Sequence, residues 1–252
     1  MNSLSALFKG GTSLSKCYPG SIERFSEDID LTFVPVQDMN NKKYSKELKR
    51  IEAVIADGFQ IEKIEAERND RNKSAYVWPE HENRDSCRIK TYIQEYLEKE
   101  EMDEVVQEFD LQEVFVNTLD ITRTFLDKVM AVKRHAICGT LERKVRHIYD
   151  VTVLFRRTDI QTFLKDTERL KQLLKLTKET DSFYLQKRNI SEEYDPIGAY
   201  DFESWKHKFD YHIRERYESL HEDLLYTFEK QNFDDAIVIF EKINEIFSGL
   251  GG

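Results

Sequence analysis

Two aspartates stand one residue apart, shortly after a pair of glycines, in the stretch KGGTSLSKCYPGSIERFSEDIDLTF of residues 9–33. A single residue separates Asp28 from Asp30, so in a β-strand both side chains would leave the same face. Neighbouring carboxylates repel each other unless a cation lies between them. Mg²⁺ suits such a pair, because it binds few carboxylates and shares its other positions with water and substrate phosphate. The pair therefore indicates a metal site.

The glycine pair has the residue types of a phosphate-binding turn. Gly10 and Gly11 can adopt positive φ and, without a Cβ, let backbone amides approach a phosphate. Thr12 and Ser13 add hydroxyl donors, and Lys16 adds a positive charge. The alternative is an ordinary turn followed by a strand with two solvent-facing acids. Either pattern alone is common, but both together in this order at a strand edge favour a site for a triphosphate and its metal.

A second cluster is a basic island at residues 128–150, in a chain whose net charge is -10. Its acids are Glu142 and Asp150, and its basic residues and histidines are Lys128, Lys133, Arg134, His135, Arg143, Lys144, Arg146 and His147. Arg143, Arg146, His147 and Asp150 would share one face of a helix. Such an island suits a triphosphate or an RNA backbone. A solvated helix face is the alternative, although it would not need an acid in its middle.

The elements that must position these residues change along the chain. Strand patterns are found at residues 29–36, 59–65, 73–78 and 87–96, with a helical pattern at 40–57. Beyond about residue 120 only helical periodicity is found, at 125–134, 142–156, 160–175, 201–226 and 233–247, with Asp201 and Asn232 as expected N-caps. This order predicts an α+β fold: a mixed β-sheet core with helices over residues 1–120, then an all-helical domain over 121–252.

The composition narrows the class of protein. Hydrophobic residues make up 40% and charged residues 34% of the 252 residues, which is typical of a globular chain. The acidic net charge argues against general nucleic-acid binding, yet it allows a local basic site. The three cysteines are widely spaced and indicate neither a zinc ribbon nor a disulfide framework. No apolar run is long enough to span a membrane and no signal peptide opens the chain, so a cytoplasmic protein is expected.

The motifs resemble a known family. KGGTSLSK followed by RFSEDIDL resembles the AbiEii-type nucleotidyltransferases, a branch of the DNA polymerase β-like superfamily and the toxin half of bacterial toxin–antitoxin pairs. RTFLDKVMAVKRHA (123–136) is similar to the helical motif of that family built around a lysine, and RKVRHIYDVTVLF (143–155) to its R-x-x-Y-D-type motif. DYHIRERY and FDDAIVIFEKINEIF resemble its closing helices. The resemblance runs from about residue 7 to residue 247.

The resemblance implies a magnesium-dependent transfer of a nucleoside monophosphate from an NTP. Asp28 and Asp30 would bind Mg²⁺, Lys128 would bind phosphate and Asp150 would be the second essential acid, these four being the catalytic residues. The implied nucleotide-binding residues are Gly10, Gly11, Thr12, Ser13, Lys16 and Arg146. The implied acceptor is the 3′ end of a tRNA, whose blocked aminoacylation would arrest translation, and the implied partner is a cognate antitoxin.

Two features depart from the family pattern. Members usually carry a few helical turns before the KGGT strand, whereas this motif begins at residue 9. The superfamily often has a third carboxylate on a later strand, and here Glu95 is only a weak candidate. Two alternatives stay open: transfer to a protein hydroxyl or to the enzyme itself, and a non-catalytic remnant that binds nucleotide or a partner.

Overall fold

The computed structural model describes residues 6–18, 20–26, 28–35, 39–56, 59–68, 73–79, 100–102, 104–105, 118–185, 190–227 and 229–250. The expected strand at 87–96, with Glu95, lies outside these residues. The chain forms two compact units: one comprises Met1–Leu7 and Phe33–Asn117, and the other Phe8–Thr32 and Thr118–Gly252. The second unit thus unites the glycine and aspartate motifs with the helices that follow residue 118.

Strands β1 (Ala6–Lys9) and β2 (Asp30–Phe33) form a two-stranded sheet, and the division between the units passes through both. The strand expected at 29–36 is present but shorter. Its apolar residues Ile29, Leu31 and Phe33 alternate with polar ones, but they do not form one buried face, since Ile29 is 74% exposed and Leu31 is also exposed. Of the three, only Phe33 is buried, against Tyr44 and Ile51.

The first unit contains the helix expected at 40–57 and the two strands expected at 59–65 and 73–78, each with slightly different bounds. Helix α2 (Asn41–Ile55) begins after Asn40, whose side chain accepts a hydrogen bond from Lys43 N. Strands β3 (Phe59–Lys63) and β4 (Ala75–Pro79) pair antiparallel, and the short 3₁₀ helix η1 (Glu65–Glu67) follows β3. The described structure is therefore α+β, with small sheets and mostly helices.

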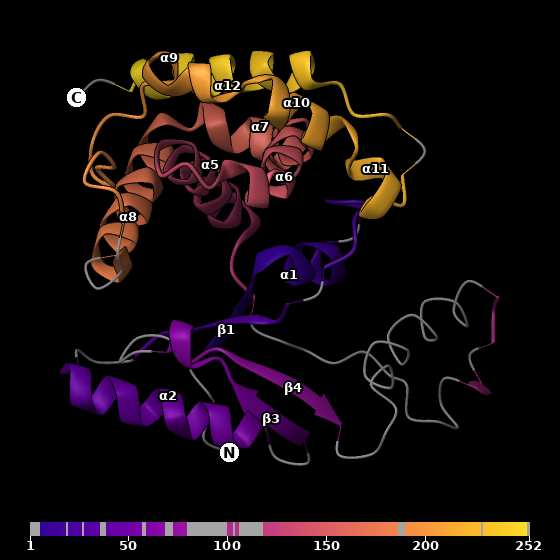
Figure 1. Cartoon of the computed structure of the whole chain (residues 1–252), viewed down its shortest axis with the longest axis vertical. Coiled ribbons are helices and arrows are strands. Elements are labelled where there is room, and N and C mark those ends of the chain that lie inside the picture. The colour runs from indigo at the N-terminus through magenta and orange to yellow at the C-terminus, as the bar shows by residue number, and fades with distance from the viewer. Residues whose placement is uncertain are drawn as a thin grey trace. The chain divides into compact units, whose positions relative to one another are not determined.

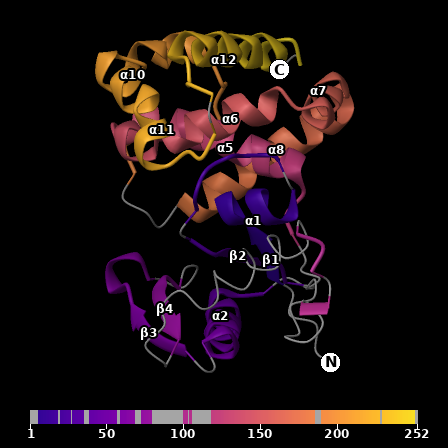
Figure 2. The same cartoon turned by 90° about the vertical axis from the view of Figure 1, so that its right-hand side faces the viewer.

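The second unit is helical apart from its strand residues. Its elements are α1 (Gly10–Cys17), α5 (Ile121–Ile137), η2 (Leu141–Lys144), α6 (Arg146–Phe155), α7 (Thr158–Lys165), α8 (Thr167–Leu185), α9 (Phe202–Trp205), η3 (Lys206–Lys208), α10 (Tyr211–Glu218), α11 (Leu220–Asp223) and α12 (Phe233–Ser248). Helix α5 lies in the middle of this bundle, beside α6, α7 and α8 (Figure 1). Helix α12, in yellow, runs along α6 and α10 in both views (Figure 2).

Helix α5 is buried on nearly every side, which fixes the segment that carries Lys128. Phe125, Leu126, Val129 and Val132 are inaccessible to solvent and belong to one hydrophobic core. A second part of that core is aromatic and joins α9, α10 and α12 through Phe202, Trp205, Phe209, Tyr217, Phe233 and Phe240. Since packing makes most of the stability of a helix, α5 is a rigid support for its side chains.

Several helices expected to be continuous are interrupted. The pattern at 160–175 is broken at Asp166, whose side chain accepts a hydrogen bond from Arg169 N at the start of α8. The pattern at 201–226 becomes α9, η3, α10 and α11. Asp201 stands at the expected N-cap position, of α9, but its φ is +36° and its side chain makes no capping hydrogen bond. The cap at Asn232 is confirmed, since it accepts from Asp234 N.

None of the helices within the described residues is long and apolar enough to cross a membrane.

Candidate functional site

The glycine pair does not form a turn between strands. Instead, Gly10 and Gly11 are the first two residues of helix α1. The φ of Gly10 is +86°, and a Cβ there would overlap the Asp30 carboxylate. Gly11 is helical, and a Cβ on it would lie 2.5 Å from Arg24 Nη2 and 2.8 Å from Ser26 Oγ. Both glycines are therefore required by side chains of the same site, which is a different reason from the phosphate approach that the sequence suggested.

The hydroxyls expected to contact phosphate donate hydrogen bonds inside the motif. Thr12 Oγ1 donates to Asp28 O, and Ser13 Oγ donates to Gly10 O at 3.0 Å. The backbone N–H groups of the first turn of α1 have no partner within the helix, as in any α-helix. They point along the axis at the end where the helix dipole is positive, so this turn can bind an anion.

Asp150 is at the centre of a buried ion-pair cluster. It lies on α6 and is inaccessible to solvent. Its Oδ1 accepts from Arg24 Nε at 2.6 Å, and its Oδ2 accepts from Arg24 Nη2 at 2.9 Å. The Lys128 ammonium, from α5, is 3.0 Å from the same Oδ2. Three segments far apart in the chain are thus joined by one carboxylate.

His147 completes the cluster. Its Nδ1 is 3.1 Å from Lys128 Nζ and 3.8 Å from Asp150 Oδ2. Burial and the charge of Lys128 lower the pKa of His147 to about 3. The imidazole is therefore neutral at pH 7, with Nδ1 accepting from the Lys128 ammonium and the proton on Nε2.

The two neighbours of His147 have shifted pKa values of their own. Burial alone would raise the pKa of Asp150, but the charges of Lys128 and Arg24 and the Arg24 hydrogen bonds hold it well below its ordinary value. Burial lowers the pKa of Lys128, and so does the charge of Arg24, whereas the charges of Asp150 and Asp30 and the hydrogen bond to Asp150 oppose these effects. The influence of Asp30 on Lys128 also indicates that the aspartate motif lies near the cluster.

Asp28 and Asp30 are exposed, in contrast to Asp150. Asp28 precedes β2, its side chain is 65% exposed, and its Oδ2 is 3.4 Å from Arg146 Nη2 at the start of α6. Asp30 begins β2 and lies against Gly10. Contacts therefore connect Asp30 with Gly10, Gly11 with Arg24, and Asp28 with Arg146.

Asp28 and Asp30 suit a cation that takes only some of its ligands from the protein and the others from water and a substrate phosphate. Within the described part of the chain, no group of three or more His, Cys, Asp or Glu side chains could hold a metal ion alone. Two exposed carboxylates beside an anion-binding helix end are a suitable donor set for Mg²⁺, which leaves several positions to water and phosphate.

The other predicted site residues are placed less centrally. Lys16 lies in the last turn of α1, about 9 Å along the axis from Gly10 at 1.5 Å per residue. Arg143 belongs to the 3₁₀ helix η2 and α6 begins only at Arg146, so the face expected for four residues is reduced to Arg146, His147 and Asp150.

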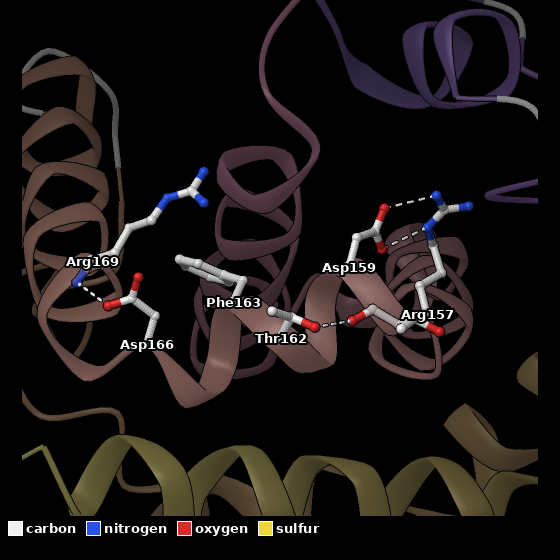
Figure 3. Close-up of a pocket in the computed structure, with 7 residues that line it drawn as sticks. Arg157, Asp159, Thr162, Phe163, Asp166 and Arg169 are labelled. Carbon is white, nitrogen blue, oxygen red and sulfur yellow. Dashed lines mark hydrogen bonds and ion pairs between the residues drawn. The ribbon is translucent and has the colours of Figure 1, made fainter.

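A shallow pocket of about 690 Å³ lies elsewhere in the second unit, along α7 (Figure 3). Its lining includes Arg157, Asp159 and Arg169. Arg157 forms a two-point ion pair with Asp159, and Arg169 lies 3.8 Å from Asp120. Both arginines are thus matched by carboxylates, and no lining residue belongs to the cluster around Asp150. This pocket is not the nucleotide site that the motifs indicate.

Sequence reasoning missed Arg24. It stands within the RFSEDIDL motif, but its partner Asp150 is 126 residues away, and no local spacing announces that pairing. One signal was available: Arg24 is a lone cation between the glycine and aspartate motifs.

The family comparison agrees with this geometry. Residues 3–238 match the family model of the nucleotidyl transferase AbiEii toxin of type IV toxin–antitoxin systems. No curated protein and no solved structure matches the chain. The family implies nucleotidyl transfer as the activity, a nucleotide as substrate and an antitoxin as partner. Because the match covers most of the sequence and includes every residue of the site, the chain belongs to the AbiEii nucleotidyl transferase toxins.

Proposed function

We propose that this protein transfers a nucleoside monophosphate from an NTP to the 3′ end of a tRNA, with Mg²⁺ at Asp28 and Asp30. One observation carries the proposal: a continuous series of contacts joins Asp30, Gly10, Gly11, Arg24, Asp150 and Lys128. The N-terminal end of α1, the Asp30 carboxylate and the buried Lys128 ammonium are thus neighbours, and Thr12 Oγ1 donates to the backbone O of Asp28 at the same helix end.

The first turn of α1, from Gly10 to Ser13, binds the β- and γ-phosphates through backbone N–H groups. Lys128 supplies a compact positive charge that opposes the negative charge developing on the phosphoryl oxygens in the transition state. Its buried position strengthens that interaction, because fixed charges act more strongly where water is excluded. A bound Mg²⁺ would supply charge neutralisation on the phosphates and the leaving pyrophosphate.

Asp150 positions Lys128 instead of acting as the general base. Both of its oxygens accept hydrogen bonds from Arg24, and Oδ2 also contacts Lys128. A carboxylate held in this way, with a pKa well below its ordinary value, is a weak proton acceptor. The proton of the acceptor hydroxyl therefore leaves to another base or to water.

The acceptor binds at the basic residues around the start of α6. Arg143 is exposed, and Lys144 and Arg146 are half-buried. They form a local positive surface on an acidic chain, as an RNA backbone requires.

The experiment is to incubate the protein with total tRNA, Mg²⁺ and each α-³²P-labelled NTP in turn. The wild type is expected to label RNA, and Asp28→Asn to lose at least 10²-fold in rate. Asp235→Asn is the matched control, because Asp235 is similarly exposed and lies 3.5 Å from an arginine, Arg156, away from the motifs.

The label also separates the alternatives. Labelling of RNA supports the proposal if prior periodate oxidation of the RNA 3′ end prevents that labelling. Label on protein would favour transfer to a protein hydroxyl, and no label with any NTP would favour the non-catalytic remnant.

A further inference from the structure

The residues on either side of Arg24 are hydrogen-bonded to distant segments of the chain. Glu23 N donates to Tyr149 OH at 3.1 Å, and Tyr226 N donates to Glu23 O at 3.1 Å. Phe25 N donates to Leu224 O, so that Arg24 forms an isolated antiparallel bridge with Leu225. The Arg24 backbone is thereby held between α6 and the segment that follows α11. Its side chain has little freedom to choose another partner.

All three nitrogens of the Arg24 guanidinium donate hydrogen bonds within the protein. Nε and Nη2 donate to the two oxygens of Asp150, and Nη1 donates to Phe25 O at 2.9 Å. Nη2 also occupies the space that a side chain on Gly11 would need. Arg24 is only 2% exposed, so it is not placed to contact a substrate itself. It acts on the site through Asp150 and Gly11.

The charge balance of the cluster explains what Arg24 adds to the pair of Lys128 and Asp150. Lys128 and Asp150 alone would form a neutral pair, in which the ammonium interacts mainly with its own carboxylate. With Arg24 bonded to both oxygens, Asp150 is already compensated, and the cluster of Arg24, Asp150 and Lys128 carries one net positive charge. His147 is neutral and accepts from Lys128, so it orients the ammonium without cancelling its charge.

We propose that Arg24 is a positioning residue of the transfer reaction, which holds Asp150 so that the Lys128 ammonium stays against His147 and its charge remains available to phosphate. This inference rests on the proposed function for its effect on rate. Its structural part, the position of the Lys128 ammonium, can be measured without any reaction.

The test compares Arg24→Met and Arg24→Lys with wild type. Methionine keeps most of the volume without the charge, and lysine keeps the charge without the planar fork. Arg68→Met is the matched control, because Arg68 forms the same kind of two-point pair with Glu52, at 2.6 and 2.8 Å, outside this site. Each variant is first checked by thermal unfolding, and all rates are measured well below its melting temperature.

The first readout is the single-turnover rate at saturating NTP, together with the Kd for NTP. Arg24→Met is expected to lower the rate by about 10²-fold. Arg24→Lys is expected to fall between Arg24→Met and wild type, with NTP affinity within about threefold of wild type in both, because the lost interaction acts in the transition state. Arg68→Met should keep the wild-type rate. A wild-type rate in Arg24→Met, or a loss confined to NTP affinity, would overturn the proposal.

The second readout is the ¹⁵N spectrum of the histidine side chains, with His147 assigned from His147→Gln. In wild type, Nδ1 of His147 should show the shift of an unprotonated nitrogen that accepts a hydrogen bond. In Arg24→Met it should move toward the shift of a free acceptor, as the ammonium turns to Asp150. An unchanged Nδ1 signal would overturn the positioning role. If wild type transferred no nucleotide while this signal moved, the proposed function would fail and the placement of Lys128 by Arg24 would stand.

Discussion

The site contains two groups of charges in different surroundings. Arg24, Lys128 and Asp150 are buried, and their contacts of 2.6 to 3.0 Å hold them in one arrangement. Asp28 and its partner Arg146 are more exposed and 3.4 Å apart, with side chains 65% and 28% accessible. Exposed pairs of this kind contribute little, on the order of 0 to 1 kcal/mol, because water and salt screen them.

This difference separates the part of the site that is formed without a ligand from the part that would need one. The buried cluster is complete without substrate, since every charged group in it has an opposite charge or a neutral acceptor. Within the part of the chain that the structure describes, Asp28 has only the loose ion pair with Arg146, at 3.4 Å. In the proposed reaction the ammonium would already be in place, and the metal would be bound together with the nucleotide.

Substitution of Lys128 should have the largest effect on rate. Lys128→Met removes the ammonium while filling its space, and we expect the single-turnover rate to fall by about 10²- to 10³-fold. Lys128→Arg should also be strongly impaired, because a planar fork cannot replace a compact charge in a buried slot.

Lys133→Met is the control for this prediction. Lys133 is a buried lysine on the same helix, but its ammonium donates to Ala199 O and lies 5.8 Å from the centre of the Tyr194 ring. Its loss should lower the melting temperature and leave the rate of the folded protein unchanged. If Lys133→Met were the severe lesion for rate and Lys128→Met the mild one, the phosphate lysine would be wrongly assigned.

A smaller effect is expected for the pH dependence of the free energy of unfolding, which His147 should influence. His147 has a folded-state pKa of about 3, whereas an unfolded histidine has a pKa of about 6.5. Between these values the unfolded chain binds more protons, so the stability that neutral His147 provides is full above pH 6.5 and is lost progressively as pH falls. From pH 7 to pH 5 the wild type should lose about 2 kcal/mol more than His147→Gln in urea unfolding. His207→Gln, which removes an exposed imidazole, should follow wild type; equal pH profiles for all three would show that His147 is not held neutral.

The sequence predicted the residues of this site better than their arrangement. Residue types and spacing pointed to Asp28 and Asp30, and the family resemblance pointed to Lys128 and Asp150; their catalytic roles stay predictions. Types and spacing did not predict that α1 begins at Gly10, since glycine is a poor helix former and that helix is fixed by tertiary contacts. Arg24 was invisible for a similar reason, as its pairing depends on packing across 126 residues.

The helical region shows the same limit. Periodicity located α5, α6 and α12 well, because each buries a regular apolar face. It joined residues 201–226 into one helix, whereas the structure bends there to pack Trp205, Phe209 and Tyr217 into the aromatic core. Tyr211, in the same stretch, is 69% exposed. Aromatic residues can be buried from many backbone conformations, so their spacing alone is weak evidence for a continuous helix.

Metal binding tests the central contrast between the two groups most directly. Mn²⁺ replaces Mg²⁺ as a paramagnetic probe, and its binding is measured by electron paramagnetic resonance with a non-hydrolysable NTP analogue. The Asp28→Asn/Asp30→Asn double variant should lose the protein-bound Mn²⁺–nucleotide signal, while Asp150→Asn, shown to be folded by circular dichroism, should keep it. Loss of bound Mn²⁺ in Asp150→Asn with retention in the double variant would contradict the account, because the metal would then belong to the buried carboxylate.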